Sequence, residues 1–425
     1  MEETITNLQK FVGSAEEKRL VKGISFEFER QPDYFNVEID NCNASKGVFF
    51  TQADVTLQYL TQYRLHSKLD LEVSPEDYCR MVSYDDIFYM NPLKEVVEKG
   101  LTSLCFPEYK DYAPAFLALL KFFKNIDQHQ SALYQVMQTY EYDSHLTAAL
   151  AYHLFSQLIP RHEYIVDKYS THLPRVCPCS CKGTIKTGCT SLGSNDTWHG
   201  YVDMMLNQTI PVALLNKQET DSRDNNNIGS TTSGNKHEEK EMDESPIKRR
   251  RQDETHHEAA KSCDELLSLH AMDQIIAKTI TNAFVQLRNC EDLHKWLIPT
   301  IGCSADSIIV FMYNPQHDFL IQSSRLMSLW CGPDSKKLNL GTVISIWMLI
   351  NFKLFTKPRL NEKLGFKKSR FCECAGQSLF FYQNIETMDS FQDADICSSA
   401  VQHYSLVYRY LKPKGNEGAN EDSVS

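Results

Sequence analysis

Two residues on neighbouring predicted strands have side chains suited to metal-dependent hydrolysis. Residues 200–206 and 210–215 have the composition of strands, and the polar residues 207–209 between them predict a hairpin. Asp203 lies in the first strand, and Lys217 follows the second. Carboxylate oxygens bind hard divalent cations, and a lysine can orient or activate the attacking water. An aspartate and a lysine placed on such a hairpin could therefore hold a divalent cation, Mg²⁺ or Mn²⁺, and a water molecule.

This arrangement resembles the core of the PD-(D/E)XK, or restriction-endonuclease-like, nuclease superfamily, over residues 145–355. The resemblance implies phosphodiester hydrolysis of nucleic acid, with metal held by an aspartate on the second strand and an acid-x-lysine on the third. Asp203 and Lys217 match two of these positions, whereas Leu215 occupies the acid position and cannot bind a cation. Residues 215, 217 and 219 share a strand face, so Glu219 either substitutes for the acid or begins the segment beyond the strand.

His199 is a second candidate at the same place. It precedes Tyr201 by two residues and Asp203 by four, so the three side chains would share one face of a continuous strand. A histidine there can serve as a metal ligand or a proton carrier, and it can equally support the core through hydrogen bonds of its ring.

Three alternating cysteines, Cys177, Cys179 and Cys181, suggest a different kind of metal site. An extended segment would place their sulfur atoms on one face, and Cys189 follows as a fourth ligand. This set predicts zinc. The alternative is a loop of free thiols, because the spacing differs from that of common zinc fingers.

Basic residues occur in two further segments. The first alternates with Phe355, Phe366 and Phe371, a composition that binds phosphates and stacks bases, although a solvated loop has the same composition. Its basic residues are Lys357, Arg359, Lys363, Lys367, Lys368 and Arg370. The second segment is the run Lys248, Arg249, Arg250 and Arg251, which predicts an import-receptor site.

This second basic run lies in a polar segment, residues 218–262, that we predict to be disordered. Its few large apolar side chains cannot bury enough surface to offset the chain entropy lost on folding. The segment separates the predicted third strand from the next helix, so we expect an insert in one domain rather than a linker between two. Residues 412–425 form a second polar stretch, predicted to be a disordered tail.

The elements around these candidates predict an α/β (α+β) fold with a mixed central sheet flanked by helices. Residues 1–144 read as a mixed, mostly helical region, with strand-like alternation at residues 24–39. Residues 145–411 form the nuclease-like core, in which a helix at residues 145–159 precedes the strands and another begins near Ser262.

Composition limits the functional classes. The chain has 425 residues, 42% of them hydrophobic, and a net charge of −11, which argues against a surface that is basic throughout. No signal-peptide pattern or membrane-spanning segment is visible, and 14 cysteines then indicate reduced thiols, so we expect a nuclear or cytoplasmic location. Three functions stay open: a metal-dependent nuclease, an inactive interaction or scaffold protein of the nucleus, and a zinc-stabilised binding module.

Overall fold

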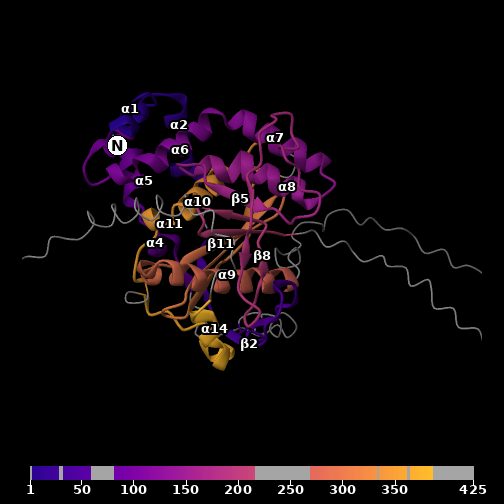
Figure 1. Ribbon diagram of the computed structural model, residues 1–425. Coiled ribbons are helices and arrows are strands. Elements are labelled where there is room, and N and C mark those ends of the chain that lie inside the picture. The colour runs from indigo at the N-terminus through magenta and orange to yellow at the C-terminus, as the bar shows by residue number, and fades with distance from the viewer. Residues whose placement is uncertain are drawn as a thin grey trace, which may run out of the picture.

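The computed structural model describes residues 2–27, 32–58, 81–215, 269–332, 335–360 and 364–385. In these residues a mixed sheet lies between two sets of helices, one above it and one below it in Figure 1. The predicted α/β class, with a mixed central sheet flanked by helices, is confirmed.

The sheet has the strand order β4-β1-β13-β12-β11-β10-β9-β5-β6, with β14 paired to β12. The first strands in the chain are β1 (Tyr34–Val37), β4 (Met81–Val82), β5 (Tyr164–Asp167), β6 (Thr187–Gly188) and β9 (Met204–Leu206). The later ones are β10 (Ile210–Leu214), β11 (Ile298–Cys303), β12 (Ser307–Asn314), β13 (Phe319–Ser323) and β14 (Met327–Ser328). Strands that are distant in the sequence therefore share one sheet, since β1 pairs antiparallel with β13.

Four neighbouring strands position the candidate residues. β5 pairs antiparallel with β9, and β9 pairs antiparallel with β10. β10 then pairs parallel with β11, and the long helix α9 (Leu269–Asn289) lies between these two strands in the sequence. A parallel pair requires such a crossover, which explains why α9 packs on the sheet beside β10, β11 and β12.

Helices cover the opposite face of the sheet in two tiers. α10 (Leu340–Ile350) is buried from its second residue to its last and lies next to the sheet. A second layer of helices lies outside α10, and the Trp347 indole N–H of α10 donates to the Ala115 carbonyl of that layer (2.9 Å). This layer comprises α1 (Glu2–Gln9), α2 (Ala15–Lys22), α5 (Asn91–Lys99), α6 (Ala113–Lys124), α7 (Ile126–Thr139) and α8 (Asp143–Leu150).

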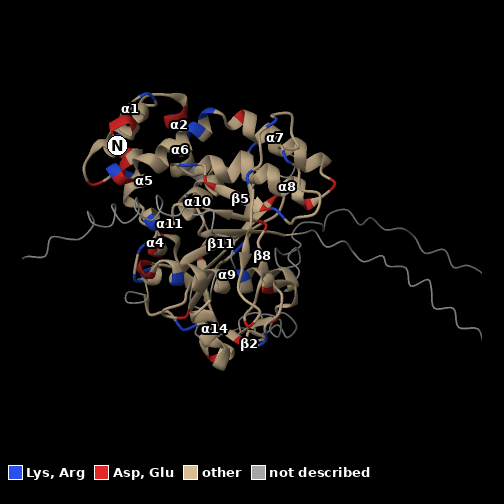
Figure 2. Ribbon diagram, viewed as in Figure 1, with Lys and Arg blue, Asp and Glu red and all other residues tan. Residues whose placement is uncertain are grey.

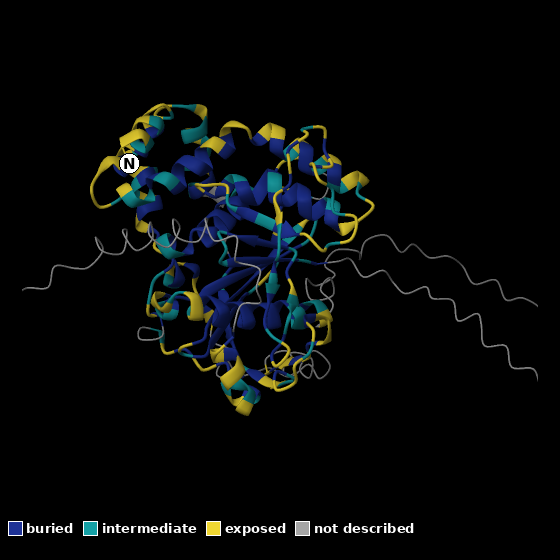
Figure 3. Cartoon of the chain, viewed as in Figure 1, coloured by how far each residue is buried: buried dark blue, intermediate teal, exposed yellow. Residues whose placement is uncertain are grey.

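The helical layer carries both signs of charge. In the view of Figure 2, α2 and α5 each carry both acidic and basic residues, whereas the charged residues of α1 are acidic. Figure 3 shows the buried residues concentrated in the sheet and the helices beside it, with exposed residues at the outer turns. The core that holds the candidate sites is therefore the sheet and its two flanking layers.

Two predicted strands differ from the structure. The segment Gly23–Glu27 forms a π-helix, in which Gly23 lies so close to Ile344 of α10 that an added Cβ would be 2.9 Å from its Cδ1. Residues 200–206 are split: β8 (Gly200–Tyr201) pairs with β7 (Ser191–Leu192), and only β9 joins the main sheet. The split arises because the Val202 N–H donates to the Thr190 carbonyl and draws the chain away at that point.

Smaller elements complete the fold. β2 (Ile39–Cys42) pairs with β3 (Val55–Leu57), and α13 (Phe371–Ala375) and α14 (Leu379–Gln383) follow the short helix α11 (Phe352–Phe355). The predicted insert and tail lie outside the described residues. In the part of the chain that is described, no helix combines the length and apolarity needed to cross a bilayer.

Candidate metal centre

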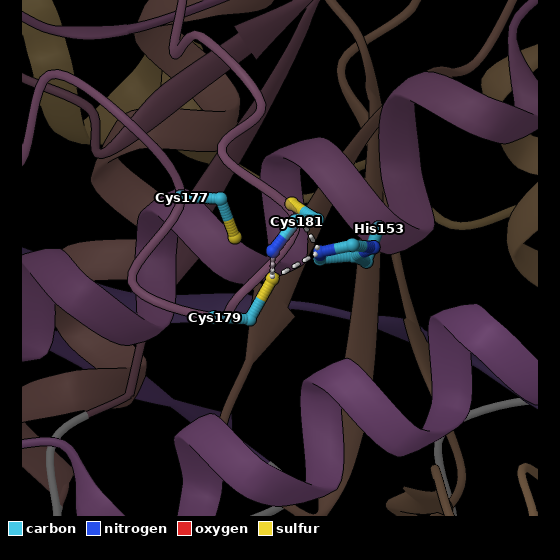
Figure 4. Close-up of side chains that lie close together, drawn as sticks. All are labelled: His153, Cys177, Cys179 and Cys181. Carbon is cyan, nitrogen blue, oxygen red and sulfur yellow. Dashed lines mark hydrogen bonds between the residues drawn. The ribbon is translucent and has the colours of Figure 1, made fainter.

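Four potential metal ligands converge at the edge of the sheet beneath the helical layer. His153, Cys177, Cys179 and Cys181 each offer one ligand atom, and the four atoms all lie within 4.8 Å of one another. His153 Nε2 is 3.0 Å from Cys179 Sγ and 3.4 Å from Cys181 Sγ. Figure 4 shows the three cysteine side chains gathered around one edge of the His153 ring. Such a cluster can hold a metal ion.

The histidine comes from an irregular helical turn. α8 continues into the π-helical turn η7 (Ala151–Phe155), and His153 is in the middle of this turn with 1% of its surface exposed. A π-turn changes the direction of the side chains that follow it and often marks a functional site.

The cysteines come from a hairpin-like loop between β5 and β6. An isolated bridge joins Val176 to Thr184, and the Cys177 N–H donates to the Gly183 carbonyl (2.7 Å). Gly183 has no room for a side chain, because a Cβ would be 2.1 Å from Cζ of the Tyr152 ring. The loop is thus folded back so that alternate residues face the histidine.

Backbone amides point at two of the sulfur atoms. The Cys181 N–H lies 3.3 Å from Cys179 Sγ, and the Gly183 N–H lies 3.4 Å from Cys181 Sγ. Hydrogen bonds of this kind favour the thiolate over the thiol. The loop geometry therefore suits sulfur atoms that carry negative charge.

Burial sets the protonation of the metal-free cluster. It lowers the pKa of His153 to about 4, so the imidazole is neutral, which is the form that binds metal. It raises the pKa of the Cys177 thiol well above its usual range and raises that of Cys179 as well. These thiols therefore keep their protons until a cation displaces them, and metal binding must release protons.

Cys189, the predicted fourth ligand, does not belong to this group of four. It follows β6, which pairs with β5 and carries the chain past the cluster, and its Sγ lies 3.1 Å from the Ser191 hydroxyl oxygen. His153 takes the fourth place. The sequence offers one signal for it, a histidine in an otherwise apolar helical run, but no spacing that links it to cysteines 24 or more residues away.

Asp203 directly precedes β9, beside the end of β5. Its Oδ2 accepts the Leu214 N–H (2.9 Å) and lies 3.9 Å from Lys278 Nζ, while its carbonyl accepts the Asp167 N–H (3.1 Å). Burial raises the pKa of the Asp167 carboxyl, and the Asp203 charge adds to this effect. Lys278, from α9, is a lysine at this place that the sequence did not indicate.

The other members of the predicted hydrolytic motif are not assembled in the described residues. Leu215 is buried, and its N–H donates to the Cys303 carbonyl (2.7 Å), so the acid position faces the core. Lys217 and Glu219 lie outside the described residues.

His199 does not share a continuous strand with Asp203, because the chain leaves the ladder between β8 and β9. Its Nδ1 lies 2.9 Å from the Thr197 carbonyl, and its ring packs on Phe49 with centroids 4.5 Å apart. The predicted shared face with Asp203 is therefore wrong, and the ring is held by local contacts.

The basic stretch after α11 lacks the aromatic surface expected of it. Phe355, Phe366 and Phe371 are buried and cannot stack on bases.

Lys367 pairs with Glu38 (3.2 Å), and Arg370 pairs with Glu373 (3.1 Å). Lys357 donates to the Asp85 carbonyl, and the Arg359 N–H donates to the Lys295 carbonyl (2.9 Å). Lys368 is exposed, and Lys363 lies outside the described residues, as do Lys248, Arg249, Arg250 and Arg251.

Comparisons with protein-family models, with curated proteins and with solved structures found no match for this chain.

Proposed function

We propose that this protein binds one zinc ion through His153, Cys177, Cys179 and Cys181. The observation that carries the proposal is the convergence of the four ligand atoms within 4.8 Å. Three thiolates and one imidazole form a soft donor set that favours zinc over Mg²⁺ or Mn²⁺. A tetrahedral site with Zn–S bonds of about 2.3 Å has S–S edges of about 3.8 Å. Small shifts of the side chains would therefore admit the ion.

The donor set fits a structural rather than a catalytic ion. Four protein ligands complete a tetrahedron, whereas catalytic zinc keeps a position open for water or substrate. His153, Cys177 and Cys179 are also buried, which limits access to solvent. The ion would fasten the loop between β5 and β6 to the helical layer.

Metal analysis of purified protein tests this proposal. Wild type and Cys189→Ser are expected to hold about one zinc per chain, whereas His153→Ala and Cys179→Ser lose it. Cys189→Ser is the matched control, because it removes a thiol that lies outside the cluster. A wild-type protein that takes up no zinc after reduction and reconstitution would contradict the proposal, as would equal loss in the control.

We propose metal-dependent phosphodiester hydrolysis as a second function. Its support is the order β5, β9, β10 and α9, with Asp203 directly before the second of these strands and a helix after the third, as the nuclease resemblance implies. Asp203 would bind Mg²⁺ or Mn²⁺, and Lys278 lies close enough to its carboxylate to act in place of, or together with, Lys217. The buried Leu215 at the acid position weighs toward the rival function, an inactive interaction or scaffold protein.

Cleavage assays separate these two. Single- and double-stranded DNA and RNA would be incubated with the protein in Mg²⁺ or Mn²⁺, alongside Asp203→Ala and the exposed control Asp196→Ala. Hydrolysis predicts activity in wild type and Asp196→Ala that Asp203→Ala lacks. Absence of cleavage, or cleavage that survives Asp203→Ala, favours the scaffold.

A further inference from the structure

A second buried histidine lies directly behind the candidate zinc ligand. His129, from α7, has its Nδ1 3.1 Å from Nδ1 of His153 and is 7% exposed. The Phe122 ring stacks on the His129 ring, with centroids 5.4 Å apart and planes 11° apart. The histidine is therefore held in one orientation by α6 on one side and by the ligand on the other.

We propose that His129 is the positioning residue of the zinc site, accepting the Nδ1–H of His153 so that Nε2 faces the sulfur atoms. This proposal rests on the zinc function above and extends it to a residue outside the ligand set. It also makes α7 part of the metal centre.

The assignment follows from what one imidazole can hold. A neutral imidazole carries one proton, and a metal ion binds the lone pair of the ring nitrogen that lacks it. The nitrogen of His153 that faces Cys179 and Cys181 is Nε2. Ligation through Nε2 therefore leaves the proton on Nδ1. That N–H is buried and needs an acceptor, and the ring atom at hydrogen-bond distance is Nδ1 of His129. His129 must then carry its own proton on Nε2.

Metal-bound histidines generally donate their second ring N–H to a fixed acceptor, and loss of that acceptor lowers metal affinity by about 10- to 100-fold. The plain alternative is that two core histidines satisfy each other with no effect on metal. The two possibilities differ in what a substitution of His129 does to zinc affinity as opposed to folding.

Three variants of the full chain distinguish them. His129→Leu removes the acceptor, while His129→Asn keeps an oxygen near the place of Nδ1. Leu133→Ala is the matched control, because it leaves a cavity on the buried face of α7 one turn away and keeps the hydrogen bond between His129 and His153. Zinc affinity would be measured by competition with a chelator, the ligand geometry by the visible spectrum of the Co²⁺ form, and metal-free stability by urea unfolding.

The proposal expects a zinc affinity about 10- to 100-fold lower in His129→Leu, with a changed Co²⁺ spectrum, and recovery to within a few-fold in His129→Asn. Leu133→Ala should lose stability but keep its affinity. Unchanged affinity in His129→Leu, or an equal loss in Leu133→Ala, overturns the role of His129. A wild type that binds neither zinc nor Co²⁺ instead overturns the zinc function.

Nitrogen NMR of the zinc-loaded wild type provides a test that does not depend on a variant folding. The expected spectrum has His153 metal-bound at Nε2 and protonated at Nδ1, with a hydrogen-bond coupling to an unprotonated Nδ1 of His129. Ligation through Nδ1 of His153, or a proton on Nδ1 of His129, contradicts the proposal.

Discussion

Removal of the metal should release one loop while the sheet stays folded. The loop from Cys177 to Gly183 has seven residues, of which Cys177, Cys179 and Gly183 are buried and none is a large aliphatic or aromatic residue. Ordering seven residues costs about 7–14 kcal/mol, at roughly 1–2 kcal/mol per residue. Burial of apolar surface cannot offset this cost, because the loop has almost none.

The hydrogen bonds within the loop are also too weak to offset the entropy cost of ordering it. Two backbone hydrogen bonds close it, from the Cys177 N–H to the Gly183 carbonyl and from the Ile185 N–H to the Arg175 carbonyl. Each contributes about 0.5–1.5 kcal/mol. The apparent binding free energy of structural zinc, about 10–16 kcal/mol in small peptides, has the required size.

Hydrogen exchange with and without a chelator, under reducing conditions, measures this effect. With free zinc at about 1,000 times its Kd, binding stabilises the closed loop by about 4.1 kcal/mol, which corresponds to about 1,000-fold slower exchange. Chelation should therefore speed exchange of the Cys177 and Ile185 amides by about that factor and leave β11 and β12 protected. Equal protection with and without metal would refute the reasoning. Loss of protection throughout the sheet would show that the ion holds the whole fold rather than one loop.

Three further predictions follow from single features of the chain. Gly183→Ala should lower the free energy of unfolding of the zinc form by about 1–3 kcal/mol through the clash with Tyr152, measured by urea unfolding. Gly332→Ala is the control, because its added Cβ would meet no atom within 4 Å, and it should change the free energy of unfolding by less than about 0.5 kcal/mol. Burial, together with the Asp54 charge, raises the pKa of Asp273 to about 7, so its stabilising contribution is complete below about pH 4 and is lost as the pH rises to 7. Asp273→Asn should reduce the fall of the urea unfolding midpoint between about pH 4 and pH 7. If wild type and Asp273→Asn show the same dependence of the midpoint on pH, this role of Asp273 is contradicted. Replacing residues 248–251 by alanine should abolish nuclear accumulation of a tagged chain, and an unchanged nuclear signal would remove the import hypothesis.

The local hydrophobic pattern predicts those strands and helices that bury one continuous face. Apolar runs at residues 307–312 and 319–323, with turn residues at 314–316 between them, predict two strands, and these are β12 and β13. The apolar pattern of residues 341–355 predicts a helix, which the structure forms as α10 and α11 with a break at Asn351. These segments bury a continuous face, so the sequence pattern carries the signal by itself.

β11 could not be predicted in this way, although it is central in the sheet. It contains Pro299 and Gly302, which both weigh against a strand. The structure explains the glycine, because a Cβ would lie 2.6 Å from Ile309 and 2.7 Å from Ile275 of α9. Close approach of a helix to the sheet is a tertiary requirement that no local pattern reveals.

The residues of the metal centre also fall into two groups, those that a local sequence pattern predicts and those that only tertiary contacts bring together. Cys177, Cys179 and Cys181 are adjacent in sequence, and their alternation predicted a shared face. His153 and His129 reach them only because α8 and α7 fold over the loop, so their roles depend on contacts between distant segments. Cys189 is near the three cysteines in the sequence, but the pairing of β6 with β5 carries the chain away from the cluster before it.

X-ray absorption at the zinc edge of the purified full-length protein tests the zinc centre most directly. The expected shell has three sulfur atoms at about 2.3 Å and one nitrogen at about 2.0–2.1 Å. The same measurement on Cys189→Ser should give an identical spectrum. A shell of four sulfur atoms, a shell of oxygen and nitrogen alone, or protein without zinc would contradict the assignment of His153 and the three cysteines as its ligands.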